Sequence, residues 1–262
     1  MIKLKMINED ICISKDEFLI VQEKDIEFKN PVVFLTYPTS GVIGPIISNQ
    51  MISSLKLKEI GFFKSKFLSP VVIFTDNVLK HPYLIYSNDD GSIVLISINY
   101  PVPQSSYLAV AEGLINWVDR ELNAKYIVCL DAIPVQVRPD KKIVITAAEK
   151  EIADELKKYA VEIYEDGVVL GLSGAIMSEA LLRKIVGIAL LTPATINFPD
   201  PEAALHIVEV INDFFKLGID TQPLIKESEN IKKQLTLMSQ KQQQIEKEKI
   251  LPPRSSLRES FV

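Results

Sequence analysis

The chain contains the stretch Val33-Phe-Leu-Thr-Tyr-Pro-Thr-Ser-Gly-Val-Ile-Gly-Pro45, which opens with apolar residues and continues through two glycines three positions apart. This order predicts a β-strand, a tight loop and the start of a helix, as in α/β folds. Such loops can bind phosphate on free backbone amides. The stretch lacks the third glycine of a dinucleotide fingerprint and the Gly-Lys-Ser/Thr ending of a P-loop, and Pro45 removes one amide donor. We therefore predict that Gly41 and Gly44 form a structural loop, with phosphate binding as the less favoured alternative.

Six short runs rich in β-branched residues are candidate strands. They are Val32–Leu35, Val71–Phe74, Ile93–Ile98, Ile127–Leu130, Ile143–Ile145 and Val168–Leu170. Most are apolar throughout and do not alternate with polar residues, which is typical of strands that helices cover on both faces. We expect a central, buried sheet, with Asp89-Asp90-Gly91 as a hairpin turn between two of its strands.

Segments with helical periodicity lie between these runs. They are Ile46–Leu57, Tyr107–Leu122, Glu149–Tyr159, Ser173–Ile188 and Pro201–Leu217. The alternation of strand and helix predicts a three-layer α/β fold. The helix at Pro201 has the clearest boundaries, because Asp200 can cap its free amides, Pro201 suits the first turn and Gly218 follows the last turn.

The composition becomes polar after Gly218, and residues 227 to 249 are predicted to form a helix with few apolar positions. Those positions, Ile231, Leu235, Met238 and Ile245, form a narrow stripe that fits heptad spacing. The stripe is consistent with oligomerisation through a coiled coil and with a helix that packs one edge on its own domain. Pro252-Pro253 then ends the helix. We expect a globular domain over 1–220, a helical extension over 221–250 and a flexible tail over 251–262.

The composition describes an ordinary folded protein. Of the 262 residues, 47% are hydrophobic and 24% are charged, with a net charge of −5, which argues against nucleic acid as a partner. The two cysteines are too few for a disulfide framework, and Cys129 lies in an apolar run that suits a reduced core thiol. The N-terminus does not resemble a signal peptide, and the longest apolar stretch, Ile185–Leu191, is too short to span a membrane. We expect a cytoplasmic protein.

Residues that could carry catalysis are scarce. The only histidines are His81 and His206, and the chain has no Gly-x-Ser-x-Gly motif. The segment Gly171-Leu-Ser-Gly174 approaches that motif, but Ser173 is better explained as the N-cap of the helix that follows. No spacing of histidine, cysteine or acidic residues suits a metal. The sequence therefore predicts no catalytic residue, no cofactor and no metal, and it assigns Ser173 and Gly174 to a structural loop.

Several separated blocks resemble the proteasome assembly chaperone family. The resemblance runs from Gly171 through Thr192-Pro193, continues in Phe198-Pro-Asp-Pro-Glu-Ala-Ala204, and includes the earlier blocks Ser40–Pro45 and Leu57–Phe63. It covers roughly residues 30 to 240 in one order. It implies a fold similar to that of purine nucleoside phosphorylases, with a mixed central sheet flanked by helices, but without that enzyme's active site.

The same resemblance implies homo-oligomers that contact the α-subunits of the proteasome core particle. Where present, the family's docking signature is a C-terminal hydrophobic residue, a tyrosine and any residue. This chain ends Ser260-Phe261-Val262, which keeps a penultimate aromatic ring but lacks the tyrosine hydroxyl and the preceding hydrophobic residue. Phe261 and Val262 are thus candidate partner-binding residues, and a terminus without a partner is the alternative.

The sequence favours a non-catalytic assembly chaperone or activator-like factor of the proteasome. Two other classes remain open. One is a small-molecule enzyme of the nucleoside phosphorylase or ATP-grasp ligase type, since some archaeal relatives carry an ATP-grasp label. The other is an oligomeric scaffold without a link to the proteasome.

Overall fold

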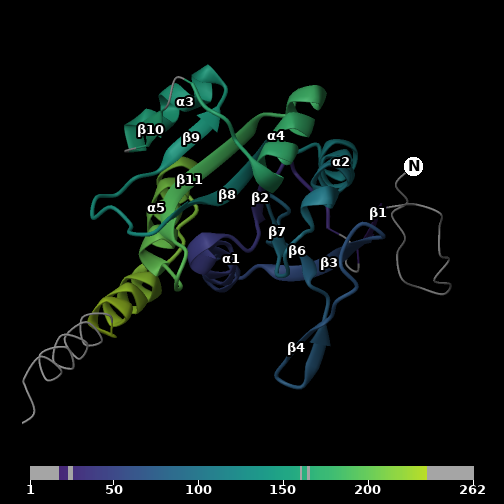
Figure 1. Ribbon diagram of the computed structural model, residues 1–262. Helices are drawn as coiled ribbons and strands as arrows, with labels where there is room; N and C mark the ends of the chain where they lie inside the picture. Colours follow the sequence, from purple (N-terminus) through teal and green to yellow (C-terminus); the bar gives the residue numbers. More distant parts are fainter. Residues whose placement is uncertain (1–17, 23–25, 160, 164–165, 235–262) are drawn as a thin grey trace, which may run out of the picture.

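The computed structural model describes residues 18–22, 26–159, 161–163 and 166–234 (Figure 1). Nine strands form one sheet in the order β1-β3-β6-β7-β2-β8-β11-β9-β10. The neighbouring strands β7, β2, β8 and β11 are parallel, whereas β1, β3 and β6 join antiparallel at one side and β9 pairs antiparallel with β11 at the other. The sheet is therefore mixed, with a parallel centre.

The strands of this sheet have the following bounds: β1 Phe18–Gln22, β2 Val32–Thr36, β3 Lys58–Ser65, β6 Tyr83–Ser87, β7 Ile93–Ile98, β8 Tyr126–Val135, β9 Ile145–Ala148, β10 Glu162–Ile163 and β11 Gly187–Thr195. Two further strands, β4 Ile73–Thr75 and β5 Val78–Lys80, form a separate two-stranded hairpin. Figure 1 shows this hairpin projecting from the body of the molecule.

Helices cover both faces of the sheet. The helices are α1 Ile43–Ser54, α2 Tyr107–Trp117, α3 Lys150–Leu156, α4 Gly171–Arg183 and α5 Pro201–Phe215, with single helical turns at Ser40–Val42, Gln104–Ser106, Val118–Leu122 and Lys157–Tyr159. Residues 222–234 are also helical. Successive residues of β2 point to opposite faces. Val33 and Leu35 pack with α2 and α4, whereas Phe34 packs with α1 and α5. The predicted three-layer fold with a central sheet between helices is confirmed.

The start of α5 shows how the sequence sets a helix boundary. The Asp200 carboxylate accepts a hydrogen bond from the Ala203 amide at 3.1 Å, and Pro201 occupies the first turn, as predicted. Lys216 ends the helix in a left-handed conformation, and Gly218 follows at φ +74°. The capping aspartate therefore fixes where α5 leaves the loop after β11.

Some of the expected elements are wrong or shifted. The strand expected at Ile143–Ile145 begins only at Ile145, and the helix expected over Ile46–Leu57 is Ile43–Ser54. Val168–Leu170 is a loop, in which Val168 is 80% exposed and Leu170 is 74% exposed, so its apolar residues do not mark a strand. Val71–Phe74 overlaps β4 of the projecting hairpin and lies outside the central sheet. The helix expected to reach Ile188 ends at Arg183, because the next apolar residues pair with β8 as β11.

Several smaller expectations are confirmed. The turn at Asp89-Asp90-Gly91 joins β6 to β7, with Gly91 at φ +69°. Cys129 is a buried, free thiol on β8. Both expectations hold.

Over the residues that the structure describes, none of the helices has the length and apolar composition needed to cross a membrane. The division of the chain at residues 220 and 250 stays a prediction.

Candidate functional site

The glycine loop at Gly41 and Gly44 is packed tightly against its own domain. Gly41 has φ +66°, and a Cβ atom there would lie 2.8 Å from the Cβ of Asp200. A Cβ atom at Gly44 would lie 2.0 Å from the Tyr37 carbonyl oxygen. The Gly41 carbonyl also accepts a hydrogen bond from the Asp200 amide at 2.8 Å. These contacts explain both glycines through close packing, and they give the phosphate-binding alternative no support.

A polar cluster lies where β2 ends beside the middle of β8. The Tyr37 hydroxyl donates to the Asp131 carboxylate and lies 2.7 Å from the Ser173 hydroxyl of α4. The other Asp131 oxygen accepts from the Ala132 amide at 2.6 Å. The cluster therefore connects two strands to α4 through groups that hydrogen-bond one another.

The electrostatics of this cluster favour the neutral forms of its groups. Burial, together with the charge of Asp131, raises the pKa of Tyr37 above its ordinary value. Burial raises the pKa of Cys129 to about 12, and burial also raises the pKa of Asp131 despite the hydrogen bond from Tyr37. Nucleophilic catalysis by a cysteine requires the thiolate. Since Cys129 and Ser173 are fully buried, the cluster is built as an internal connection between elements.

The structure corrects the role expected for Ser173. The N-cap of α4 is Leu170, and Ser173 lies inside the helix, where its hydroxyl reaches Tyr37. Gly174 lies one residue further along α4, and a Cβ atom there would be 2.3 Å from the Val169 carbonyl oxygen. The two residues are thus in a helix packed on the sheet, and the loop expected around them ends at Leu170.

A second polar cluster joins the start of α5 to the C-terminal helix. Arg138 contacts Asp200 at 3.2 Å and Glu202 at 2.5 Å, and it is largely buried. Lys232 contacts the same Glu202 carboxylate at 2.6 Å, and the Ser228 hydroxyl donates to it at 3.3 Å. Burial favours a raised pKa for Glu202, but the hydrogen bond from Lys232 and the charge of Arg138 outweigh it and lower the pKa. No local sequence pattern indicates this cluster, because Arg138, Glu202 and Lys232 are far apart in the chain.

The residues expected to support oligomerisation and partner binding are only partly within the described chain. Ile231 lines a pocket with Val137 and Phe198 of its own domain, which is the contact expected of a helix that packs on that domain. Leu235, Met238 and Ile245 lie outside the described residues, as do Phe261 and Val262. Their roles stay predictions.

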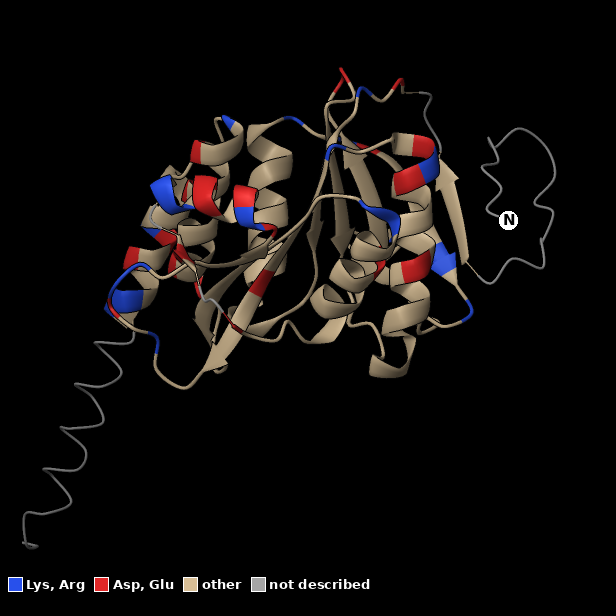
Figure 2. Cartoon of the chain, turned by 90° about the horizontal axis from the view of Figure 1, so that it is seen from above, with Lys and Arg blue, Asp and Glu red and all other residues tan. Residues whose placement is uncertain are grey.

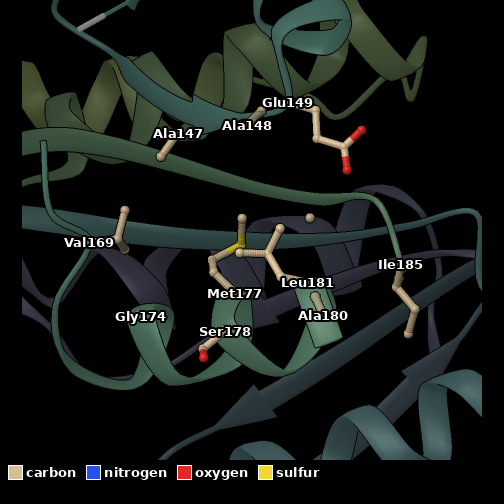
Figure 3. Close-up of a pocket in the computed structure, with 11 residues that line it drawn as sticks. Ala147, Ala148, Glu149, Val169, Gly174, Met177, Ser178, Ala180, Leu181 and Ile185 are labelled. Carbon is tan, nitrogen blue, oxygen red and sulfur yellow. The ribbon is translucent and has the colours of Figure 1, made fainter. Parts of the chain in front are cut away.

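Two surfaces expose apolar side chains. The first is the hairpin of β4 and β5, where Val72, Phe74, Val78 and Leu79 are exposed. The second is a pocket of about 450 Å³ between α4, β9 and the loop before α4 (Figure 3). Its lining includes Val169, Met177, Ala180, Leu181 and Ile185. Elsewhere, Figure 2 shows basic and acidic residues interspersed on the helices and loops around the sheet.

Among the described residues, no group of three or more histidine, cysteine, aspartate or glutamate side chains is placed to hold a metal ion. The features that distinguish the molecule are thus a polar cluster in the sheet, whose Asp131 lines a pocket of about 550 Å³, a charged cluster beneath the C-terminal helix and two exposed apolar surfaces.

Comparison with known proteins identifies relatives of similar sequence and fold. The chain is 30% identical over 220 residues to an uncharacterised protein of Methanocaldococcus jannaschii, covering 84% of this chain and 90% of that one. The structure of Pyrococcus furiosus PbaA, described as an archaeal homolog of proteasome-assembly chaperone, is similar with a TM-score of 0.77 and 25% identity, covering 89% of this chain and 96% of PbaA.

The structure of Pyrococcus furiosus PbaB, described as an archaeal proteasome activator, shares the fold with a TM-score of 0.76 and 21% identity, covering 85% of this chain and 99% of PbaB. The sequence model of the PAC2 family matches residues 33–239, which includes the central strands and all the long helices of both layers. The chain belongs to the PAC2 family.

Proposed function

We propose that the protein is a non-catalytic assembly chaperone or activator-like factor of the proteasome, which binds core-particle α-subunits as a homo-oligomer. The observation that carries this proposal is the membership of the PAC2 family over residues 33–239, joined to the similarity with PbaA over 89% of the chain. PbaA is described as a homolog of proteasome-assembly chaperone. Since a fold alone does not determine function, the proposal needs support from the chain's own residues.

The polar cluster of Tyr37, Asp131 and Ser173 supports a binding role over a catalytic one. Its thiol and hydroxyl are buried, and its groups hydrogen-bond one another. Enzymes tune such groups toward reactive protonation states. Here Asp131 lines a pocket, but the shifts in pKa favour the neutral forms of the Tyr37 hydroxyl and the Cys129 thiol. The apolar hairpin and the pocket on α4 are surfaces of the kind that protein partners cover.

The test is direct binding to proteasome particles. Full-length protein is immobilised and incubated with α-subunit rings and with complete core particles, and retained subunits are quantified. We expect both to be retained, because the proposed contact is made to α-subunits. Retention of neither would reject the proposal.

Self-association belongs to the same proposal and has its own measurement. Light scattering at micromolar concentration is expected to give a multiple of the 29.4 kDa chain mass. A monomer mass would reject the homo-oligomer while leaving proteasome binding to be judged from the retention experiment. Calorimetry with ATP and magnesium addresses the ligase alternative, and micromolar binding there would favour an enzyme.

A further inference from the structure

A pocket of about 550 Å³ lies between the sheet and the loop that precedes α4. Its lining includes Leu191 of β11, which is paired in register with Asp131 of β8 on one side and with Ile145 of β9 on the other. Side chains paired in this way project from the same face of a sheet. Residues 167–170 of the loop also line the pocket, whose volume is in the range of sites that enclose a small molecule.

The pocket makes part of the inner sheet accessible to solvent. Asp131 and Leu191 are half-buried although β8 and β11 are inner strands, which α/β proteins commonly cover on both faces. Cys129, two residues before Asp131 on the same face, is by contrast fully buried in the core that α4 covers. The helical cover therefore ends between these two residues of β8, and Asp131 can be reached from solution.

Asp131 is the one charged side chain among the described residues that line the pocket. The lining is otherwise mostly aliphatic, as at Ile133, Ala147 and Val169. An apolar wall with a single well-placed polar group is the arrangement that fixes the orientation of a small ligand. Burial in these surroundings raises the pKa of Asp131, and a positive group beside it would favour the ionised carboxylate.

The Asp131 carboxylate retains the capacity to accept hydrogen bonds. One of its oxygens accepts from the Tyr37 hydroxyl, and the other accepts from the Ala132 amide at 2.6 Å. A carboxylate has about four acceptor sites on its two oxygens, so these bonds leave room for a further donor. Hydrogen bonds from a cationic N–H group to a carboxylate are roughly twice as strong as those between neutral groups. A ligand that complements Asp131 therefore carries a cationic nitrogen.

We propose that this pocket binds a small molecule with an apolar body and a primary amine, whose ammonium group donates to the Asp131 carboxylate. The apolar body would lie against Ile133, Ile145 and Leu191. A phosphate or carboxylate ligand would meet a like charge, and the described residues of the lining include no lysine, arginine or histidine to offset it. The site does not depend on the proposed function, because binding of an amine and retention of proteasome α-subunits are measured separately and either can fail alone.

Three indole compounds that differ in one terminal group test the preference for an amine. Tryptamine carries an ammonium group at neutral pH, tryptophol carries a hydroxyl and indole-3-acetate carries a carboxylate. Calorimetry measures their binding to the full-length chain. We expect tryptamine to bind about tenfold more tightly than tryptophol, and indole-3-acetate to bind most weakly, because the indole contacts are shared. Equal affinities, or no binding of tryptamine at millimolar concentration, would overturn the proposal.

Asp131→Asn tests which residue holds the amine. The substitution removes the charge and keeps an oxygen that can accept from Tyr37. It should weaken tryptamine binding about tenfold and change tryptophol binding by less than about twofold, so that the preference for the amine disappears. Asp213→Asn is the control, because Asp213 is exposed on α5 and does not line the pocket. If the two variants bind tryptamine equally well, Asp131 does not hold the amine and the proposal is wrong.

Ala147→Phe tests whether the pocket encloses the indole ring. Ala147 lies two residues after Ile145 on the same face of β9 and lines the pocket, so a phenyl ring there would fill part of its space. We expect this variant to bind none of the three compounds. Ala109→Phe is the control, at a half-buried alanine of α2 outside the pocket. Circular dichroism establishes that each variant is folded before its binding is compared, and unchanged tryptamine binding by folded Ala147→Phe would contradict the proposed site.

Nuclear magnetic resonance of the isotope-labelled parent chain locates the ligand without any substitution. Tryptamine is expected to shift the amide signals of Asp131, Ile145 and Leu191 more than those of residues outside the pocket. This measurement decides the location even if a variant does not fold. Largest shifts at another surface would overturn the proposal.

Discussion

Gly44 of α1 lies against the backbone of Tyr37, the residue that follows β2. The two backbones are so close that a side chain at Gly44 has no room. A Cβ atom at this position would be 2.0 Å from the Tyr37 carbonyl oxygen, a backbone atom that cannot turn away. We expect Gly44→Ala to lower the free energy of unfolding by about 3 kcal/mol, as overpacking does in tight sites. Urea denaturation measures the change.

The control for this substitution is Gly167→Ala. No heavy atom lies within 4 Å of a Cβ atom built at Gly167. The control should therefore change the free energy of unfolding by less than about 0.5 kcal/mol. Equal effects of the two substitutions would show that Gly44 does not pack closely against the Tyr37 carbonyl oxygen.

Asp131 should make stability depend on pH in a direction opposite to that of most carboxylates. Burial raises its pKa in the folded state above the ordinary value of about 3.9. The folded state then holds the proton more tightly than the unfolded state, so the contribution of Asp131 is present below pH 4 and is lost as pH rises toward the folded pKa. Asp131→Asn removes this loss and keeps an oxygen that can accept from Tyr37.

The measurement is urea denaturation of the parent chain and of Asp131→Asn from pH 4 to pH 8. We expect the parent to lose stability relative to the variant as pH rises, by about 1.4 kcal/mol for each unit by which the pKa is raised. Since Tyr37 and Cys129 have raised pKa values, both remain neutral through this range. A pH-independent difference would contradict a raised pKa at Asp131.

At the scale of elements, the Asp200 carboxylate stabilises the start of α5. Asp200 caps the helix through the Ala203 amide and contacts the largely buried Arg138 guanidinium at 3.2 Å. Asp200→Ala is expected to cost about 2 kcal/mol, because a capping interaction is worth about 1 kcal/mol and Arg138 also loses one of its two carboxylates. Asp200→Asn should cost about half as much, since its side chain still accepts from the amide.

Asp213→Ala is the matched control for the cap, because Asp213 is an exposed aspartate of the same helix. Thermal unfolding monitored by circular dichroism would rank the three variants. If Asp200→Ala and Asp213→Ala unfold at the same temperature, the cap and the contact with Arg138 do not stabilise α5.

The elements that the sequence predicted well are those with both a periodic pattern and a boundary signal. β2, β7 and α5 combine apolar runs with glycine, proline or aspartate at their ends. The sequence failed where an apolar run had another cause. Val168–Leu170 is apolar but exposed, and the helix expected over Ser173–Ile188 ends at Arg183, because the apolar residues from Gly187 onward pair with β8 as β11.

The polar clusters could not be predicted from local patterns. Tyr37 meets Asp131 across a separation of 94 residues and Ser173 across 136 residues. Only the order of strands in the sheet brings these side chains together, and sequence periodicity does not specify that order. Ser173 had a plausible local explanation as a cap, which concealed its contact with Tyr37.

At the scale of the molecule, the charged cluster around Glu202 fixes where the C-terminal helix leaves the domain. Glu202 of α5 contacts Arg138 on one side and Lys232 on the other, and Leu224 is buried in the core formed with α1 and α5. The helix therefore begins against the domain. In the proposed homo-oligomer, each copy would direct its C-terminal segment from the same place.

The tail predicted over residues 251–262 is a candidate for binding a partner. The eleven residues from Pro252 to Val262 can span roughly 36 Å when extended, enough to reach a pocket on a neighbouring molecule. An oligomer would present several tails together, so that weak contacts gain from effective concentration. We propose that docking depends on burial of the Phe261 ring, worth a few kcal/mol at most, and on pairing of the terminal carboxylate with a cation of the partner.

Phe261→Ala and a chain extended by one glycine after Val262 remove these contributions one at a time. Each is expected to weaken binding to proteasome core particles about tenfold or more, and to reduce any stimulation of peptide hydrolysis in proportion. Ser260→Ala serves as the control, because it changes the neighbouring side chain and leaves the ring and the carboxylate in place. If the intact protein and all three variants bind and stimulate alike, the tail does not dock, and any contact with the proteasome must be made by the folded domain.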